Sequence, residues 1–478
     1  MTAKSGMIIF GATGDLALRM LLPSLYGLDA DGLLSRDYRI LGTARSALDR
    51  EGYIALVGVA LRRHIDSARL TSDRLKIFLA RIDYIPLDVT NIAGYSHLTA
   101  ALGANIENLS IFLSTAPALF GPTIEGLVKA GLSSGRAKLA LEKPLGSDLA
   151  TSRLINDAVA VAFPEERTFR VDHYLGKETV QNLLTLRFGN ALFEPLWNAS
   201  NIDNIRITVA ETVGLEGRVG FYDDAGAMRD MVQNHMLQLL ALTAMEPPSD
   251  FEASAVRSEK VKVLRALRRI DLSSVQTDTV IGQYGPGEIG QDAVRGYVEE
   301  LGHPSETETF VAIRAHIDNW RWKGVPFFLR TGKRLAERRT EIRIQFKDVP
   351  HSIFARRGGV LLPNKLVIRL QPEENIRLLL MAKQPGLDRA GVRLREVPLE
   401  IGIDNAFTDL RRRIAYERLL LDLIDGDPTL FVRRDEVEAQ WEWVDAIRDG
   451  WKNQQMRPEP YPAGSWGPLS AVALPERN

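Results

Sequence analysis

The chain has 478 residues, of which 45% are hydrophobic and 25% charged, and these proportions are typical of globular proteins and exclude a disordered or fibrous chain. Sixty basic and 61 acidic residues give a net charge of -1, so no overall positive field exists to hold a polyanion, and we expect no nucleic acid partner. The complete absence of cysteine excludes disulfides, thiolate nucleophiles and cysteine-ligated metal sites.

We expect no targeting or membrane segment in this chain. No apolar run approaches the ~18 residues of a membrane span, and the first apolar run, residues 7–10, is too short for a signal peptide. We therefore expect a cytoplasmic protein that does not bind membranes. At roughly 150 residues per domain, the length predicts two or three domains.

The first part of the chain alternates short apolar runs with longer stretches of helical periodicity. This order is typical of βαβ units, because parallel strands covered on both faces are apolar throughout. The pattern predicts an α/β domain over residues 1–180, with a Rossmann-like, doubly wound parallel sheet. The predicted strands are residues 7–10, 38–41, 84–87, 109–113, 138–141 and 168–171, with helices at 15–28 and 122–130.

Beyond residue 180 the pattern changes to strict alternation of apolar and polar side chains, which indicates strands with one solvated face. A C-terminal α+β domain with a large, mainly antiparallel sheet is therefore predicted over residues 181–478. Its clearest strands are residues 205–209, 341–346, 366–370 and 377–381, and its clearest helices are 223–245 and 416–424.

The first predicted strand runs directly into GATGDLA at residues 11–17. Glycines at such a turn allow the backbone to approach a pyrophosphate at the N-terminus of the next helix. The alternative is an ordinary strand–helix turn, but its position on the first strand of a βαβ series favours a dinucleotide site. The predicted contacts are Gly11, Thr13, Gly14, Asp15 and Leu16.

The residue after the second strand bears on cofactor choice. NAD-binding sites usually carry an acid there for the ribose 2′-hydroxyl, whereas this chain has Arg45. An arginine suits a 2′-phosphate and favours NADP, although a surface arginine after a strand is common. Asp88 and Val89, after the third strand, are predicted to flank the adenine, and the alternative for Asp88 is a simple turn.

Two of the seven histidines lie among other chemically active residues. His173 belongs to DHYLGK at residues 172–177, where four polar side chains follow a predicted strand at the ligand-binding edge of the sheet. His235 lies on an apolar helical stripe, where a core histidine without catalytic role is the alternative. No histidine pair has metal-ligand spacing, and we expect no metal.

Several motifs together resemble the glucose-6-phosphate 1-dehydrogenase family, in its bacterial form, over nearly the whole chain. The most specific is DHYLGKE at residues 172–178, since EKP at 142–144 occurs in other sugar oxidoreductases. The remaining motifs are GATGDLA at 11–17, EGR at 216–218, RDMVQNH at 229–235, EKVKVL at 259–264, RTGK at 330–333 and AGSWGP at 463–468.

The resemblance implies catalytic and substrate-binding roles. His235 would be the base that removes the C1 hydroxyl proton of glucose 6-phosphate, with Asp172 fixing its tautomer and stabilising the imidazolium. Asp230 and His235 are ~140° apart on an α-helix, so both face one substrate only near the start of the helix or on its flank. The implied substrate-binding residues are Lys143, His173, Tyr174, Lys177, Glu211, Asp230, Lys333 and Arg338. For Glu211, Asp230, Lys333 and Arg338 taken singly, the alternative is a solvated charge.

The resemblance also implies NADP as cofactor, with Lys143 between cofactor and sugar and Arg45 on the 2′-phosphate; NAD is an alternative because a guanidinium also stacks on adenine. The product would be 6-phosphoglucono-1,5-lactone, which enters the oxidative pentose phosphate pathway. Family precedent favours a homodimer or homotetramer formed through the sheet of the second domain.

One departure from the family pattern concerns Leu18 and Met20, which stand where basic residues are usual. Loss of a charge-assisted contact typically costs about 1.5–3 kcal/mol, so weaker binding or turnover is expected. This departure leaves open one alternative, a catalytically impaired NADP-sensing protein. If Met20→Lys improves neither kcat nor KM, the absence of a basic residue at this position does not weaken binding or turnover. A second alternative, independent of this departure, is a related dehydrogenase for another pyranose, which relaxed recognition of the phosphate would mark.

Overall fold

The computed structural model describes residues 4–103, 106–215, 219–357, 359–387, 391–402 and 410–474. Contacts divide the chain into two compact units. The first unit contains Met1–Glu178, Pro248–Ser258 and Arg412–Glu438, and the second contains Thr179–Pro247, Glu259–Arg411 and Ala439–Asn478. The division into domains of residues 1–180 and 181–478 stays a prediction.

The first unit contains a six-stranded parallel sheet with the strand order β3-β2-β1-β4-β5-β6. This is the doubly wound order in which the chain reverses direction beside β1, and ligands bind at that switch point. The predicted Rossmann-like sheet is confirmed. Its strands are β1 (Lys4–Phe10), β2 (Arg39–Ala44), β3 (Ile82–Pro86), β4 (Ile106–Leu113), β5 (Lys138–Leu141) and β6 (Thr168–Arg170).

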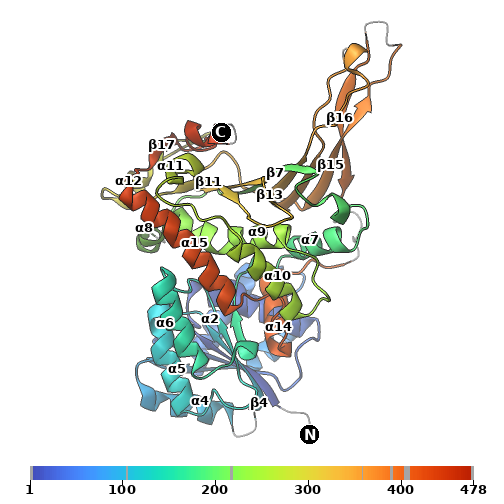
Figure 1. Cartoon of the computed structure of the whole chain (residues 1–478). Coiled ribbons are helices and arrows are strands. Elements are labelled where there is room, and N and C mark those ends of the chain that lie inside the picture. The colour runs from blue at the N-terminus through green and yellow to red at the C-terminus, as the bar shows by residue number, and fades with distance from the viewer. Residues whose placement is uncertain are drawn as a thin grey trace. The chain divides into compact units, whose positions relative to one another are not determined.

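Helices cover the parallel sheet because its strands are apolar on both faces. One face packs against α4, α5 and α6 through a core that includes Ile111, Leu139 and Phe120. On the other side α1 packs against α2 and against α14, a helix that arrives from late in the chain. The helices of this unit are the π-helix Ala17–Leu21, α1 (Leu22–Ala30), α2 (Arg50–His64), α3 (Ser72–Ala80), α4 (Tyr95–Leu102), α5 (Phe120–Lys129), α6 (Leu149–Ala160) and α14 (Ala415–Asp425). Figure 1 labels β4 of the parallel sheet and the helices α4, α5 and α6 of the same unit.

The second unit is built on a nine-stranded sheet with the order β16-β15-β14-β13-β7-β12-β11-β8-β17. Most pairs are antiparallel, as predicted, but β12 pairs parallel with β7 and β17 pairs parallel with β8. The strands are β7 (Ile202–Ala210), β8 (Thr279–Gly285), β11 (Phe310–His316), β12 (Pro326–Gly332), β13 (Arg339–Phe346), β14 (Lys365–Gln371), β15 (Asn375–Lys383), β16 (Leu394–Ile401) and β17 (Glu459–Pro462). A separate hairpin pairs β9 (Gly287–Ile289) with β10 (Asp292–Val294).

The helical region predicted at residues 223–245 is present but is not a uniform α-helix. Gly226 has a positive φ of 66° inside α8 and breaks the helical path. A π-helix follows and then continues as α9. The remaining helices are α7 (Glu178–Phe188), α8 (Val219–Ala227), the π-helix Met228–Met236, α9 (Leu237–Ala244), α10 (Ala253–Arg265), α11 (Val275–Asp278), α12 (Tyr297–Leu301), α15 (Arg434–Asn453) and α16 (Leu469–Val472). No helix among the described residues has the length and apolar character that a membrane span requires.

Candidate active site

The glycine-rich turn after β1 is folded tightly at the ligand-binding edge of the parallel sheet. Gly11 has a φ of 76°, and a Cβ atom there would lie 2.4 Å from the carbonyl oxygen of Ser114, so no other residue fits without displacing the backbone. The N–H groups of Gly11 and Ala12 donate to the carbonyl of Thr43 at 2.9 and 3.1 Å, and the N–H of Gly14 donates to Gly11 at 2.9 Å. This turn has the compactness that a pyrophosphate site requires.

The residues that follow the turn enter a short π-helix, Ala17–Leu21. Asp15 is exposed and pairs with the exposed Arg19 at 3.0 Å, while Leu16 is half-buried. Leu18 and Met20, the two departures from the family pattern, are half-buried as well. This segment therefore presents Arg19 as its cation, and that cation is already paired with a carboxylate.

The predicted ribose and adenine contacts lie together at the ends of β2 and β3. The hydroxyl of Thr13 lies 3.2 Å from that of Ser46, next to the exposed Arg45. Asp88 accepts hydrogen bonds from the N–H and the hydroxyl of Thr90, and these bonds, with a smaller contribution from Arg45, lower the pKa of Asp88. The side chains of Arg45 and Asp88 are thus electrostatic neighbours.

Val89 forms the apolar part of this edge. It is buried, and its carbonyl accepts a hydrogen bond of 3.1 Å from the hydroxyl of Tyr95. The backbone after β3 is thereby fixed against α4.

Glu142 and Lys143 follow β5 at the same edge of the sheet. Glu142 is buried, and one of its carboxyl oxygens accepts a hydrogen bond of 3.2 Å from the hydroxyl of Tyr416 on α14. Burial raises the pKa of Glu142 to about 8, against the opposing effects of Lys143 and Tyr416, and the charge of Asp172 raises it further. The charges of Lys143 and Asp172 therefore both act on this carboxyl group.

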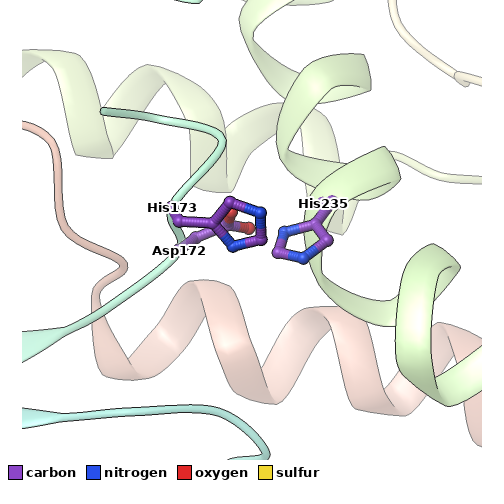
Figure 2. A group of neighbouring side chains, drawn as sticks. All are labelled: Asp172, His173 and His235. Atoms are coloured by element: carbon purple, nitrogen blue, oxygen red, sulfur yellow. The ribbon is translucent and has the colours of Figure 1, made fainter. Parts of the chain in front are cut away.

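The loop after β6 carries four predicted residues, two of which are labelled in Figure 2, Asp172 and His173. Asp172 is buried and accepts a hydrogen bond of 2.9 Å from the N–H of Tyr174. The ring of His173 contacts Tyr174 at a centroid distance of 5.0 Å and stacks on Tyr416 at 6.3 Å. The ammonium of Lys177 lies 3.6 Å from the centroid of Tyr174. One short loop thus groups a carboxylate, an imidazole, a phenol and an ammonium.

In the second unit, Asp230 and His235 lie on the π-helix Met228–Met236, and Figure 2 draws the His235 side chain on this helix. Both side chains are buried. A π-helix bonds the N–H of residue i+5 to the carbonyl of residue i, so residues five apart lie roughly one turn above each other. The ~140° separation expected for an α-helix therefore does not apply to this pair, and the angle between the two positions is smaller in this π-helix.

Glu211 and Lys333 form an ion pair at the ends of two parallel strands. The last residues of β7 and β12, Ala210 and Gly332, are partners in the parallel pairing, so the residues that follow them emerge side by side. The ammonium of Lys333 lies 2.8 Å from a carboxylate oxygen of Glu211. Lys333 is buried, whereas the predicted Arg338 is exposed in the loop before β13.

Sequence reasoning missed three aromatic or acidic neighbours of these residues. Glu142 carries a recognisable signal, because a charged residue directly after an apolar strand lies at the ligand-binding edge. Tyr416 and Tyr222 have no such signal in the sequence, because the polar residues that each contacts are distant from it along the chain. Tyr222, on α8, is buried, and its ring lies 4.7 Å from the ammonium of Lys333.

Two family models match the chain in succession. Residues 8–182 match the glucose-6-phosphate dehydrogenase NAD binding domain, and residues 184–478 match the glucose-6-phosphate dehydrogenase C-terminal domain. The glucose-6-phosphate 1-dehydrogenase of Zymomonas mobilis is 60% identical over 474 residues, covering 99% of this chain and 98% of that protein. The enzyme of the same name from Mycolicibacterium smegmatis is 50% identical and covers 98% and 96% of the two chains.

Solved structures agree with the sequence comparisons. A glucose-6-phosphate dehydrogenase in complex with its substrate glucose 6-phosphate superimposes with a TM-score of 0.89, at 33% identity, over 99% of this chain and 97% of that chain. Glucose-6-phosphate 1-dehydrogenase from Mycobacterium avium gives a TM-score of 0.86 at 36% identity, over 99% and 96%. The chain therefore belongs to the glucose-6-phosphate dehydrogenase family.

Proposed function

We propose that this chain oxidises D-glucose 6-phosphate at C1 to 6-phospho-D-glucono-1,5-lactone with NADP as hydride acceptor, the first step of the oxidative pentose phosphate pathway. Family membership across both halves of the chain supports this function. Within the molecule, the proposal is carried by the π-helix Met228–Met236, on which the buried Asp230 and His235 lie five residues apart, the spacing of its backbone hydrogen bonds. Oxidation of a sugar alcohol requires a base for the hydroxyl proton, the role proposed for His235, and Asp230 is a proposed acceptor for a sugar hydroxyl.

The residues at the edge of the parallel sheet fit a dinucleotide with a 2′-phosphate. A Cβ atom at Gly11 would clash with the backbone and one at Gly14 would be in tight contact with it, so the turn stays compact, which suits close approach of a pyrophosphate. The exposed guanidinium of Arg45 is available for bidentate contact with a 2′-phosphate. Thr13, Asp15, Leu16, Asp88, Val89 and Lys143 complete the proposed cofactor contacts. NADP, when bound, supplies the hydride acceptor of the reaction.

The proposed substrate contacts match the charges of glucose 6-phosphate and its hydroxyl groups. The loop after β6 offers His173, Tyr174 and Lys177 as donors for a phosphate dianion, which accepts charge-assisted hydrogen bonds. In the second unit, Glu211 and Asp230 are proposed acceptors for sugar hydroxyls. Lys333 is a proposed donor to the substrate, and Lys143 and Arg338 are further cations of the proposed site.

The proton leaves the oxygen of the C1 hydroxyl, and the hydride leaves C1 itself. In the proposed step, His235 accepts the proton of the C1 hydroxyl, the C1–O bond becomes a carbonyl, and the hydrogen on C1 leaves with both bonding electrons. Asp172 is the proposed carboxylate partner that stabilises the imidazolium form of His235. Such acid–base assistance is typically worth ~10²–10⁴-fold in rate.

We further propose a cytoplasmic homodimer or homotetramer, on family precedent. Light scattering of the purified protein measures the oligomeric state directly. The expectation that the reaction needs no metal stays a prediction, which activity after dialysis against a chelator tests.

The decisive experiment follows NADPH formation by absorbance with the purified protein and glucose 6-phosphate, with NADP and NAD in parallel and with unphosphorylated glucose as a second substrate. Reduction of NADP that requires the phosphate supports the proposal. Faster turnover of unphosphorylated glucose would instead establish a dehydrogenase for another pyranose. NADP binding without turnover of any sugar phosphate would establish a sensor.

A further inference from the structure

Lys333 is surrounded by groups that hold its ammonium from two sides. One carboxylate oxygen of Glu211 lies 2.8 Å from the ammonium nitrogen, and the ring centroid of Tyr222 lies 4.7 Å from it. Both Lys333 and Tyr222 are buried. Since a desolvated cation gains most from the negative face of an aromatic ring, this contact is of the stronger kind.

The backbone of Lys333 is fixed independently of its side chain. Its N–H donates to the carbonyl of Thr309 at 2.9 Å, and its carbonyl accepts a hydrogen bond of 2.7 Å from the hydroxyl of Tyr461. The pairing of β12 with β7 fixes the preceding residue. Because the backbone is fixed, the position of the ammonium depends on which of the surrounding groups the flexible side chain contacts.

The phenol of Tyr222 also experiences the charge of Asp230, the second proposed acceptor of the sugar. Burial raises the pKa of Tyr222 well above its usual value, and the largest charge contributions come from Asp230 and Glu308, with a smaller one from Glu211. The phenol therefore stays protonated among three carboxylates.

We propose that Tyr222 is a positioning residue of the substrate site, whose ring face holds the ammonium of Lys333 beside Glu211. The inference rests on the proposed function, because it assigns Lys333 and Asp230 to the substrate. An ammonium has three donor hydrogens. The ring attracts the charge without accepting one of them along a lone pair, so donors stay available for substrate oxygens.

A double-mutant cycle on the full-length enzyme tests this role. Tyr222→Leu is expected to raise KM for glucose 6-phosphate by about 3-fold to 30-fold, the range of cation–π interactions from exposed to desolvated sites, with KM for NADP unchanged. Tyr222→Phe keeps the ring face and is expected to stay close to the wild-type KM. In the Lys333→Met background the same leucine substitution is expected to change KM by less than about 2-fold, because the two effects are coupled.

Tyr297→Leu is the matched control. Tyr297 is buried in the same apolar cluster, and its ring contacts that of Tyr222 at 6.3 Å, while the ring over Lys333 is that of Tyr222. This control is expected to lower the unfolding temperature as much as Tyr222→Leu without raising KM. Equal increases in KM for both variants, or additive effects with Lys333→Met, would overturn the inference while leaving the proposed function intact.

A second measurement does not depend on truncating the core. Fluorinated phenylalanines at position 222 preserve the shape of the ring and progressively weaken its negative face. KM for glucose 6-phosphate is expected to rise stepwise with the number of fluorines, and a KM independent of fluorination would overturn the inference. Failure of the wild-type enzyme to oxidise glucose 6-phosphate would overturn the proposed function and this inference with it.

Discussion

The hydroxyl of Tyr416 donates a hydrogen bond to the buried carboxyl of Glu142, although the two residues are 274 positions apart in the chain. The ring of the same tyrosine stacks on His173 at a centroid distance of 6.3 Å and an interplanar angle of 9°. Tyr416 thus connects the residues that follow β5 with the loop that follows β6. The protonation state of Glu142 consequently bears on two neighbouring parts of the proposed site.

Glu142 is expected to make the unfolding free energy depend on pH. Its pKa rises from the ordinary 4.5 to about 8 on folding, mainly through burial, so between these values the folded protein holds a proton that the unfolded chain releases. Stability from this group is therefore greatest below the unfolded pKa and falls by up to about 1.4 kcal/mol per pH unit as pH rises towards 8. Glu142→Gln is expected to remove this slope in denaturant titrations between pH 5 and pH 8.

The control for this titration is Glu125→Gln, which removes an exposed carboxylate paired with Lys129. It is expected to retain the pH dependence of the wild type. Parallel curves for wild type and Glu142→Gln across the whole range would show that Glu142 is already ionised in the folded protein at neutral pH.

His235→Asn is expected to lower kcat by ~10²–10⁴-fold, because the amide cannot accept the C1 hydroxyl proton. Binding of glucose 6-phosphate, measured by calorimetry, is expected to change little. His173→Asn is the comparison, and there the main effect is expected in KM through a weakened phosphate contact. Near-normal turnover by His235→Asn would remove this residue from the proposed mechanism.

Arg45→Ala is expected to separate the two nicotinamide cofactors. Loss of a charge-assisted contact of about 1.5–3 kcal/mol corresponds to a rise in KM for NADP of roughly 10-fold to 100-fold, while KM for NAD stays nearly constant. The matched control is Arg63→Ala, which removes an exposed arginine from the last turn of α2. An equal rise in KM for NADP and for NAD would indicate that Arg45 contacts the adenine instead of the 2′-phosphate.

Gly11→Ala is expected to impair both cofactor binding and stability. The left-handed conformation alone costs an L-residue about 1–2 kcal/mol, and the new Cβ would lie 2.4 Å from the Ser114 carbonyl oxygen. Gly121→Ala on α5 is the control, because open space surrounds its Cβ position and alanine favours a helix. Unfolding temperature and KM for NADP report the two effects, and an unchanged KM for NADP would contradict the assignment of this turn.

The parallel sheet could be predicted from the sequence because strands buried on both faces are continuous apolar runs, and each run ends where the ligand-binding edge begins. The residues at those ends, such as Arg45 and Asp172, could be named for the same reason. For the second unit, the sequence predicted a mainly antiparallel sheet but not which strands pair with each other. Alternation has the same period in parallel and antiparallel strands, so the β7–β12 register that pairs Glu211 with Lys333 leaves no local signal.

The π-helix also could not be predicted, because side-chain periodicity over nine residues resembles that of an α-helix. This is why the angle between Asp230 and His235 was wrong. Tyr222 and Tyr416 were missed for a different reason, since an aromatic residue on a helix is usually part of an apolar core, and only tertiary contacts show which polar group it faces.

The assembly of the first unit from separate stretches of chain has a consequence for its synthesis. All six strands of the parallel sheet precede residue 171, but α14, which packs against α1 and buries Tyr416, Leu419, Leu420 and Leu423, is translated only after most of the second unit. During synthesis, the apolar surface of α1 that α14 later covers therefore remains exposed, and chaperones protect surfaces of this kind. A message truncated near codon 180 would yield a polypeptide that lacks this helix permanently and aggregates.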